Sequence, residues 1–163
     1  MFPADIERLA REVIEAAAAR GLMVATAESC TGGLVAGALT AVAGSSAVVE
    51  RGFVTYSNAA KSELLGVPAD LIDLHGAVSE PVARAMAEGA LARSAAQVAV
   101  SVTGVAGPGG GTAEKPVGLV HFAAAGPNGV VHAERRFGDN GREAVRLESV
   151  RVALGLIIDR IGA

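Results

Sequence analysis

Hydrophobic positions recur at helical spacing in the first and last segments of the chain. In residues 5–20 the apolar side chains of Ile6, Val13 and Ala17 fall on one face, and Gly21 provides a stop signal. Residues 141–161 show the same periodicity. Four shorter segments with helical spacing lie between residues 20 and 141. The predicted helices are 5–20, about 34–42, 58–65, 68–74, 79–94 and about 141–161. Ser79, at the start of the fifth of these, can cap it.

Short, mostly apolar runs alternate with these helices and predict buried strands. They cover residues 22–27, 52–57, 97–103 and about 117–125, and the turn GPNG (126–129) leads into a fifth strand that begins at 130. Strands that alternate with helices pair in parallel through right-handed crossovers, whereas the final hairpin requires an antiparallel strand. We therefore expect one domain, 1–163, with an α/β fold. It is a three-layer α/β/α sandwich around a mixed, mainly parallel sheet of about five strands.

Composition narrows the class of protein. The net charge is −3 and only 3% of residues are aromatic, so a nucleic-acid groove is not expected. No apolar run reaches the roughly 18 residues of a membrane span, and the acidic N-terminus differs from a signal peptide. A single cysteine excludes an internal disulfide. These features predict a cytoplasmic globular protein with no membrane partner.

Three polar or glycine-rich segments follow the first three predicted strands: residues 28–33, 56–61 and 103–112. Ligands usually bind beyond the carboxyl ends of parallel strands, so we expect these segments to meet at one site. Small residues in the first and third segments let backbone N–H groups face an anion, and a helix start adds a favourable dipole. No Gly-Lys-Ser/Thr follows the glycines, which argues against a kinase or ATPase.

Six sequence blocks occur in order over about 90 residues. They are AESCTGG (27–33), GSS (44–46), GFVTYSN (52–58) with Lys61, HGAVSE (75–80), TGVAGPGG (103–110) and EKPVG (114–118). In these blocks the chain resembles the stand-alone nicotinamide-nucleotide amidases related to the C-terminal domain of CinA. The resemblance implies that nicotinamide mononucleotide, a small-molecule nucleotide, is deamidated to nicotinic acid mononucleotide and ammonia in pyridine-nucleotide salvage.

The resemblance also implies a serine–lysine mechanism in which Ser29 is the nucleophile and Lys61 is the base. A serine hydroxyl needs a nearby base, and a free lysine, with a pKa of about 10.4, becomes a useful base only when its pKa falls. The residues alone allow other roles. Ser29 could cap the next helix, and Lys61 could be an exposed lysine on a short helix.

Tyr56 is the only tyrosine, and it either contacts Lys61 or leaves its hydroxyl in water. Ser46 is the second-choice serine, although it also suits a turn. Cys30 is expected to be a small buried residue rather than a thiol nucleophile. Arg142 matches a family arginine and either binds the substrate phosphate or lies on the exposed side of the last helix.

The expected substrate-binding residues are Cys30, Thr31, Gly32, Gly33, Ser46, Thr103, Gly104, Gly107 and Arg142. His75, His121 and His132 show no ligand spacing, so neither a metal nor another cofactor is expected. The apolar final helix suggests a homo-oligomer, with a dimer as the simplest form. Two other functions remain open: a non-catalytic nucleotide-binding or regulatory module, and an amidase for a different carboxamide.

Overall fold

The computed structural model describes all 163 residues and contains one five-stranded sheet. Its strands are β1 (Val24–Glu28), β2 (Val49–Val54), β3 (Val98–Gly104), β4 (Leu119–Gly126) and β5 (Gly129–Arg136), in the order β2-β1-β3-β4-β5. β1 pairs in parallel with β2 and β3, whereas β4 is antiparallel to both β3 and β5. The predicted mixed α/β sheet is confirmed.

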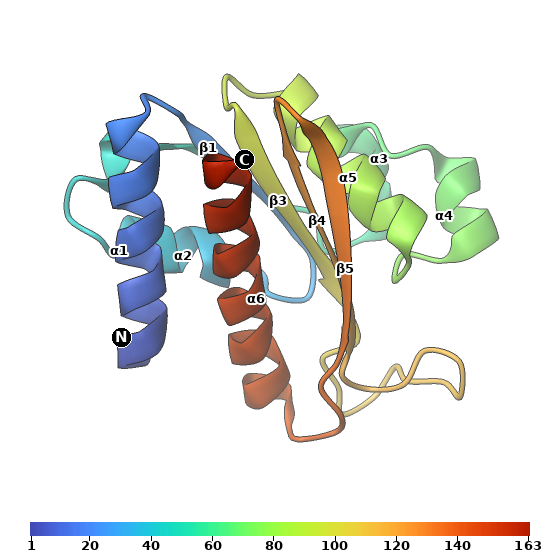
Figure 1. The fold of residues 1–163 in the computed structure, drawn as a ribbon. Helices are drawn as coiled ribbons and strands as arrows, with labels where there is room; N and C mark the ends of the chain where they lie inside the picture. The colour runs from blue at the N-terminus through green and yellow to red at the C-terminus, as the bar shows by residue number, and fades with distance from the viewer.

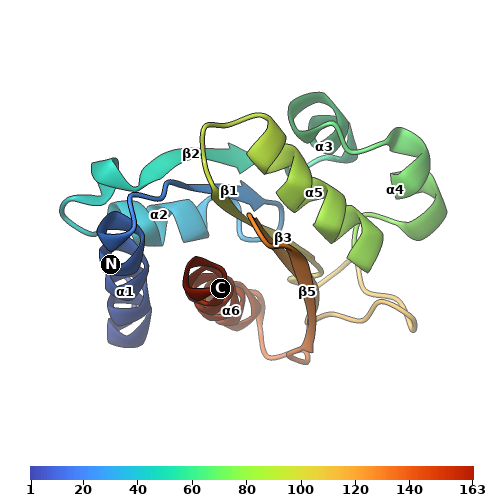
Figure 2. The same ribbon diagram turned by 45° about the horizontal axis from the view of Figure 1, so that its top comes forward.

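Helices cover both faces of this sheet (Figures 1 and 2). One face carries α1 (Ala4–Ala19), α2 (Leu34–Thr40) and α6 (Arg142–Gly162). The other carries α3 (Asn58–Leu65), α4 (Ala69–His75) and α5 (Glu80–Ala92). None of these helices combines the length and the hydropathy that crossing a membrane requires.

Successive side chains along each strand point to opposite faces of the sheet, so the core has two parts, one on each face. On β3, the side chains of Val98, Val100 and Val102 join the large cluster under α1 and α6. The intervening positions carry smaller side chains, and they face α5, where Ala83 and Ala87 pack against alanines of β4. Because small side chains let backbones approach closely, the α5 layer lies tightly on the sheet.

The largest departure from the predicted elements is at β2, and the ends of several other elements are shifted by one or two residues. β2 begins at Val49, three residues before the predicted start, because Glu50 and Arg51 interrupt the apolar pattern of an exposed edge strand. Ser79 does not cap α5 with its side chain. Its hydroxyl donates to the carbonyl of Gly76 instead, at 2.8 Å.

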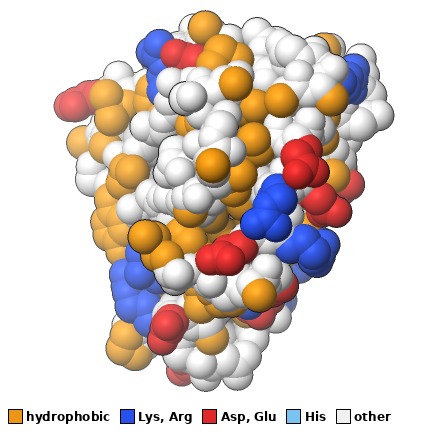
Figure 3. Space-filling view, turned by 90° about the vertical axis from the view of Figure 1, so that its left-hand side faces the viewer, with side chains coloured by type: hydrophobic (Ala, Val, Ile, Leu, Met, Phe, Trp, Pro, Cys, Tyr) orange, Lys and Arg blue, Asp and Glu red, His pale blue; other side chains and the backbone are white.

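The apolar side of α6 is buried within the same chain, against α1 and the sheet. It therefore offers no free apolar face to a second copy, and the expected dimer stays a prediction. A groove of about 360 Å³ between α1 and α2 lies on the side of the molecule seen in Figure 3, where hydrophobic side chains stand beside charged ones. None of the candidate catalytic residues lines this groove.

Candidate active site

Ser29 and Lys61 meet at the carboxyl edge of the parallel strands. Ser29 follows the last residue of β1, and Lys61 lies in the first turn of α3, which begins after β2. The Nζ of Lys61 is 3.1 Å from the Oγ of Ser29. Lys61 is 1% exposed and Ser29 is 8% exposed, so both side chains are buried. The structure thus brings together the two residues that the resemblance paired across 32 positions.

The surroundings of Lys61 favour its neutral form. Its Nζ also donates to the backbone carbonyl of Thr55, at 3.0 Å, and no carboxylate lies within ion-pair distance. Burial lowers the pKa of Lys61 below its ordinary value. A buried amine without a counter-ion is suited to accept a proton from a hydroxyl.

The turn that carries Ser29 is connected to α2 by Glu28. This side chain is 0% exposed, and its two carboxylate oxygens accept hydrogen bonds from the N–H groups of Val35 and Ala36, at 2.9 and 3.0 Å. Glu28, and not Ser29, therefore satisfies the start of α2. The expected anion site at this helix start is wrong, because a carboxylate of the protein occupies it.

Three further predicted binding residues belong to the same turn. Thr31 is fully buried, while Gly32 and Gly33 have φ values of 57° and 103°, a backbone conformation that side chains rarely adopt. None of the three lines the candidate cavity. Their place in the structure is within the turn, behind Ser29 and Cys30.

Tyr56 and Arg142 are joined by a hydrogen bond above the site. An Nη of Arg142 donates to the hydroxyl of Tyr56, at 2.8 Å, and the other donates to the carbonyl of Gly107, at 2.7 Å. The Tyr56 hydroxyl does not contact Lys61. Only the Tyr56 backbone carbonyl lies near that amine, at 3.5 Å. Arg142, at the start of α6, thus links the segments that follow β2 and β3.

The end of β3 and the segment after it form the opposite wall. Thr103 is buried and donates to the carbonyl of Ala77, at 2.9 Å, whereas Gly104 and Gly107 contribute backbone. Together with Ser29 and Lys61 these residues surround a cavity of about 570 Å³. Its lining also includes Cys30, Tyr56, Asn58, Ala77, Val78, Val105, Ala106, Gly109, Gly110 and Arg142. This volume is in the range of small-molecule sites.

Cys30 and Ser46 differ in their relation to this cavity. Burial raises the pKa of Cys30 to about 12, so its thiol is protonated at neutral pH. Ser46 is exposed in the short 3-10 helix Ser45–Ala47, which precedes β2. The amino end of β2 pairs with the amino end of β1, so Ser46 lies at the opposite edge of the sheet.

Arg146 had no predicted role, yet it contacts the Ser29 turn. It lies one helical turn after Arg142, and its Nε and Nη2 donate to the carbonyls of Cys30 and Thr31, both at 3.1 Å. The spacing of four between these arginines was the available signal, since it places both on one side of α6. Side chains of His, Cys, Asp and Glu form no group of three or more with metal-binding geometry.

The sequence was compared with models of known protein families. The model of the CinA C-terminal domain family matches residues 6–161. This chain belongs to the CinA C-terminal domain family. A relative within it, from Enterobacter agglomerans, is named nicotinamide-nucleotide amidohydrolase PncC. It is 53% identical over 149 residues, which cover 91% of each chain.

Other relatives of this CinA C-terminal domain are longer. A CinA-like protein from Anaeromyxobacter sp. strain K is 55% identical over 158 residues, which are 96% of this chain and 38% of that relative. Among solved structures, the competence/damage inducible protein CihA from Agrobacterium tumefaciens superposes with a TM-score of 0.98. It is 59% identical, over 100% of this chain and 99% of that one.

Proposed function

We propose that this chain is an amidohydrolase that converts nicotinamide mononucleotide to nicotinic acid mononucleotide and ammonia. The observation that carries the proposal is the 3.1 Å contact between the Ser29 hydroxyl and the buried Lys61 amine, which has no counter-ion. The PncC relative, similar over 91% of both chains, bears the name of that activity. The cavity beside the pair is large enough for a nicotinamide ring and its ribose.

In the proposed reaction, neutral Lys61 removes the hydroxyl proton of Ser29 while Oγ attacks the carboxamide carbon. A carbon–oxygen bond forms and the carbonyl π electrons move to its oxygen. The carbon–nitrogen bond then breaks, and protonated Lys61 donates its proton to the departing ammonia. Water attacks the resulting ester with Lys61 again as base, and this step releases the carboxylic acid and restores Ser29.

The oxyanion of each tetrahedral intermediate needs donors close to Ser29. The N–H group of Cys30 is the candidate, because Cys30 lines the cavity and its N–H has no acceptor within the chain. The N–H of Ser29 is not available, since it bonds the carbonyl of Val102, at 2.9 Å. We therefore assign an oxyanion donor to Cys30, the residue that follows the nucleophile.

The substrate phosphate requires positive charge and further donors. Arg142 supplies a guanidinium at the rim of the cavity, and the N–H groups of Gly109 and Gly110 have no acceptor within the chain. A phosphate oxygen would replace Gly107 or Tyr56 as an acceptor of Arg142. This arrangement favours a mononucleotide over a riboside, which lacks the phosphate.

Ammonia release from nicotinamide mononucleotide, nicotinamide riboside and nicotinamide tests the proposal. We expect kcat/KM for the mononucleotide to exceed that for the riboside by about 10–100-fold, since charge-assisted hydrogen bonds contribute roughly 1.5–3 kcal/mol each. Ser29→Ala should release no ammonia while remaining folded. Equal kcat/KM values would contradict the phosphate site, and a fully active Ser29→Ala protein would contradict the mechanism.

A further inference from the structure

The turn that carries Ser29 is held by charged side chains that do not reach the cavity. On the sheet side, Glu28 is the last residue of β1, and the alternation of that strand directs its carboxylate toward α2. The carboxylate bonds two N–H groups at the start of α2, whose N-cap residue Gly33 supplies no side chain. The two ends of the turn are thereby joined through one buried group.

On the other side, Arg146 reaches the middle of the turn from α6. Its guanidinium bonds the carbonyls of Cys30 and Thr31 with two separate nitrogens. A planar guanidinium that holds two acceptors fixes their relative orientation, which a single ammonium does not. Arg146 is half-buried, so this bond pair is partly shielded from water.

These bonds determine where the free amides of the turn point. A trans peptide is planar, so its N–H is directed opposite to its carbonyl. The Cys30 carbonyl is directed toward Arg146, and the N–H of Thr31 in the same peptide is therefore directed away from α6. The Ser29 carbonyl accepts from the N–H of Gly32, at 2.9 Å, which in the same way orients the N–H of Cys30.

We propose that Glu28 and Arg146 are positioning residues for the nucleophile turn. Together they hold the Ser29 hydroxyl at hydrogen-bond distance from Lys61 and keep the N–H group of Cys30 directed toward the reacting carbonyl. The proposal rests on the proposed amidohydrolase function. Neither Glu28 nor Arg146 lines the cavity, so neither contributes to holding the bound substrate.

The variants Glu28→Gln and Arg146→Met test this role with nicotinamide mononucleotide as substrate. Glu28→Gln keeps the shape of the side chain but replaces one acceptor with an NH₂ donor that faces an N–H group. We expect each variant to lower kcat by about 10–100-fold, the effect of misplacing reacting groups by a fraction of an ångström to an ångström. KM should change by less than about threefold, because the cavity lining is intact.

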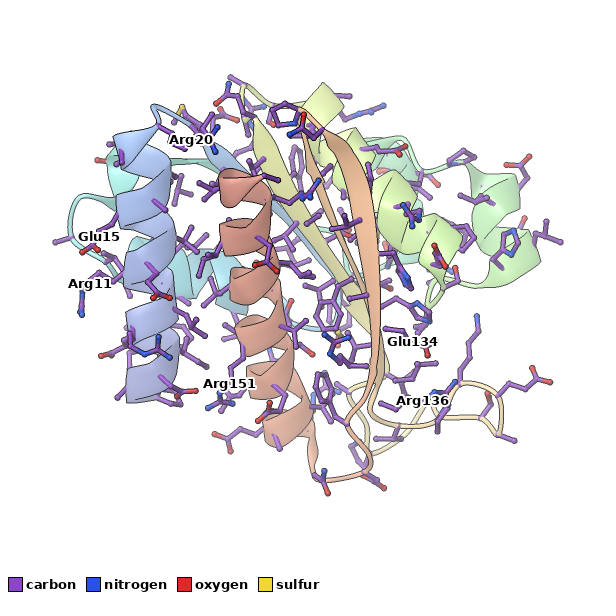
Figure 4. All side chains as sticks on the ribbon, in the orientation of Figure 1. Arg11, Glu15, Arg20, Glu134, Arg136 and Arg151 are labelled. Atoms are coloured by element: carbon purple, nitrogen blue, oxygen red, sulfur yellow. The ribbon has the colours of Figure 1, made fainter.

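Arg151→Met provides the matched control. Arg151 lies on the same helix and bonds the carboxylates of Asp5 and Glu148, and Figure 4 shows it on the α1 side of α6. Removing this guanidinium weakens the packing of α6 without touching the Ser29 turn. Its kcat should stay within about twofold of the parent, since distant sites act independently. Arg146→Lys, which retains the charge and one bond, should fall between the parent and Arg146→Met.

Amide hydrogen exchange provides a second measurement that needs no substrate. Exchange in residues 29–33 should quicken by about tenfold or more in Arg146→Met and Glu28→Gln, and stay unchanged in Arg151→Met. If Arg146→Met does not fold, Arg146→Lys and Glu28→Gln are compared instead. Parental kcat in these folded variants, unchanged exchange in residues 29–33, or an equal kcat loss in Arg151→Met would overturn the proposal.

The two proposals can fail separately. If the parent chain releases no ammonia, the amidohydrolase function is wrong, and the exchange data alone decide whether Glu28 and Arg146 hold the turn. If the parent is active and the variants match it, the positioning role is wrong and the function stands.

Discussion

The two faces of the sheet differ in the size and polarity of their buried side chains. Toward α1, α2 and α6, the strands present large apolar side chains, such as Val100, Val102 and Phe122, within a cluster of 24 buried residues. Toward α5, the same strands present small and polar side chains. Ser101 donates to the carbonyl of Ala83, at 2.6 Å, and Thr103 donates to that of Ala77, at 2.9 Å.

One face of the sheet thus buries large apolar side chains, while the other accommodates small and polar ones beside the candidate active site. Large apolar side chains supply most of the favourable burial, because the stabilisation grows with apolar area. Small side chains bury less area but let helices approach the sheet closely, and the hydroxyls there must find backbone acceptors. Lys61 belongs to the second region, where it is buried at an energetic cost and placed beside Ser29.

The largest expected effect is on turnover in Lys61→Met. This change removes the proposed base but keeps the apolar stem, so kcat should fall by about 10²–10⁴-fold. If Ser29 and Lys61 act as one unit, adding Ser29→Ala should cause little further loss. Ammonia release measures this, and a double variant in which the two losses multiply would argue against a common unit.

The same Lys61→Met variant should be at least as stable as the parent, because no charge remains to be buried. Burial lowers the pKa of Lys61, so between that pKa and about 10.4 the unfolded chain binds more protons than the folded one. Parental stability therefore rises with pH in that window. The advantage of the variant should be greatest near neutral pH and shrink as the pH approaches about 10.4, as urea unfolding at several pH values can measure.

Phe122→Ala should destabilise the fold by removing a large side chain from the apolar face of the sheet. Phe122 is fully buried under α6, and the cavity left by its ring should lower the free energy of unfolding by about 3–5 kcal/mol. Because the carboxyl-edge loops are not touched, kcat of the folded fraction should stay close to parental. Denaturant unfolding and turnover at a temperature well below the midpoint separate the two quantities.

Gly89 of α5 and Gly155 of α6 differ in how closely other atoms approach them, so alanine substitutions should affect stability in opposite directions. A methyl group on Gly89 of α5 would overlap the backbone carbonyl of Leu65, so Gly89→Ala should destabilise the chain by about 1–3 kcal/mol or more. Gly155 of α6 has no neighbouring atoms at that position, and Gly155→Ala should stabilise by about 0.5–1 kcal/mol through helix propensity. Thermal unfolding of both variants should show shifts of opposite sign.

The smallest expected effect is on the pH dependence of stability, and it comes from a pair of histidines on β4 and β5. The Nδ1 of His121 and the Nε2 of His132 are 2.9 Å apart, with Glu134, Glu80 and Lys115 nearby. Burial, together with the neighbouring imidazole, lowers the pKa of His121. As the pH falls below about 6.5 the unfolded chain takes up more protons, and stability declines.

His121→Gln should remove part of this acid sensitivity. The loss is a small fraction of the roughly 5–15 kcal/mol that stabilises a typical domain. Unfolding free energies of the parent and His121→Gln, measured from pH 8 to about pH 5, should diverge in slope. Parallel curves would show that other groups carry the acid dependence.

Much of the fold followed from periodicity. The helical spacing in the first and last segments predicted α1 and α6 to within about one residue of their bounds. The predicted bounds of β2 were three residues too late, because Glu50 and Arg51 lie on an edge strand, where charged side chains interrupt the apolar pattern of a strand. The role of Ser79 was mistaken because a hydroxyl can donate as well as accept, and Gly76 offered it a carbonyl.

The candidate site was predictable as a set of segments but not as a set of contacts. Parallel pairing of β1 with β2 and β3 required the segments after these strands to share an edge, and the predicted pair Ser29–Lys61 lies there. The same topology separated Ser46 from that edge. The contact between Tyr56 and Arg142 depends on where α6 begins relative to the edge, which no local pattern encodes.

The sequence by itself determined which segments are helices and strands, because side-chain periodicity and turn residues act over short distances. It also placed the polar and glycine-rich segments after the strands. Only the tertiary structure decided that Lys61 is buried without a counter-ion, that Glu28 fills the start of α2, and that Arg146 holds the Ser29 turn. Burial and pairing of charges depend on neighbours distant in the chain, and these are set when the layers pack against the sheet.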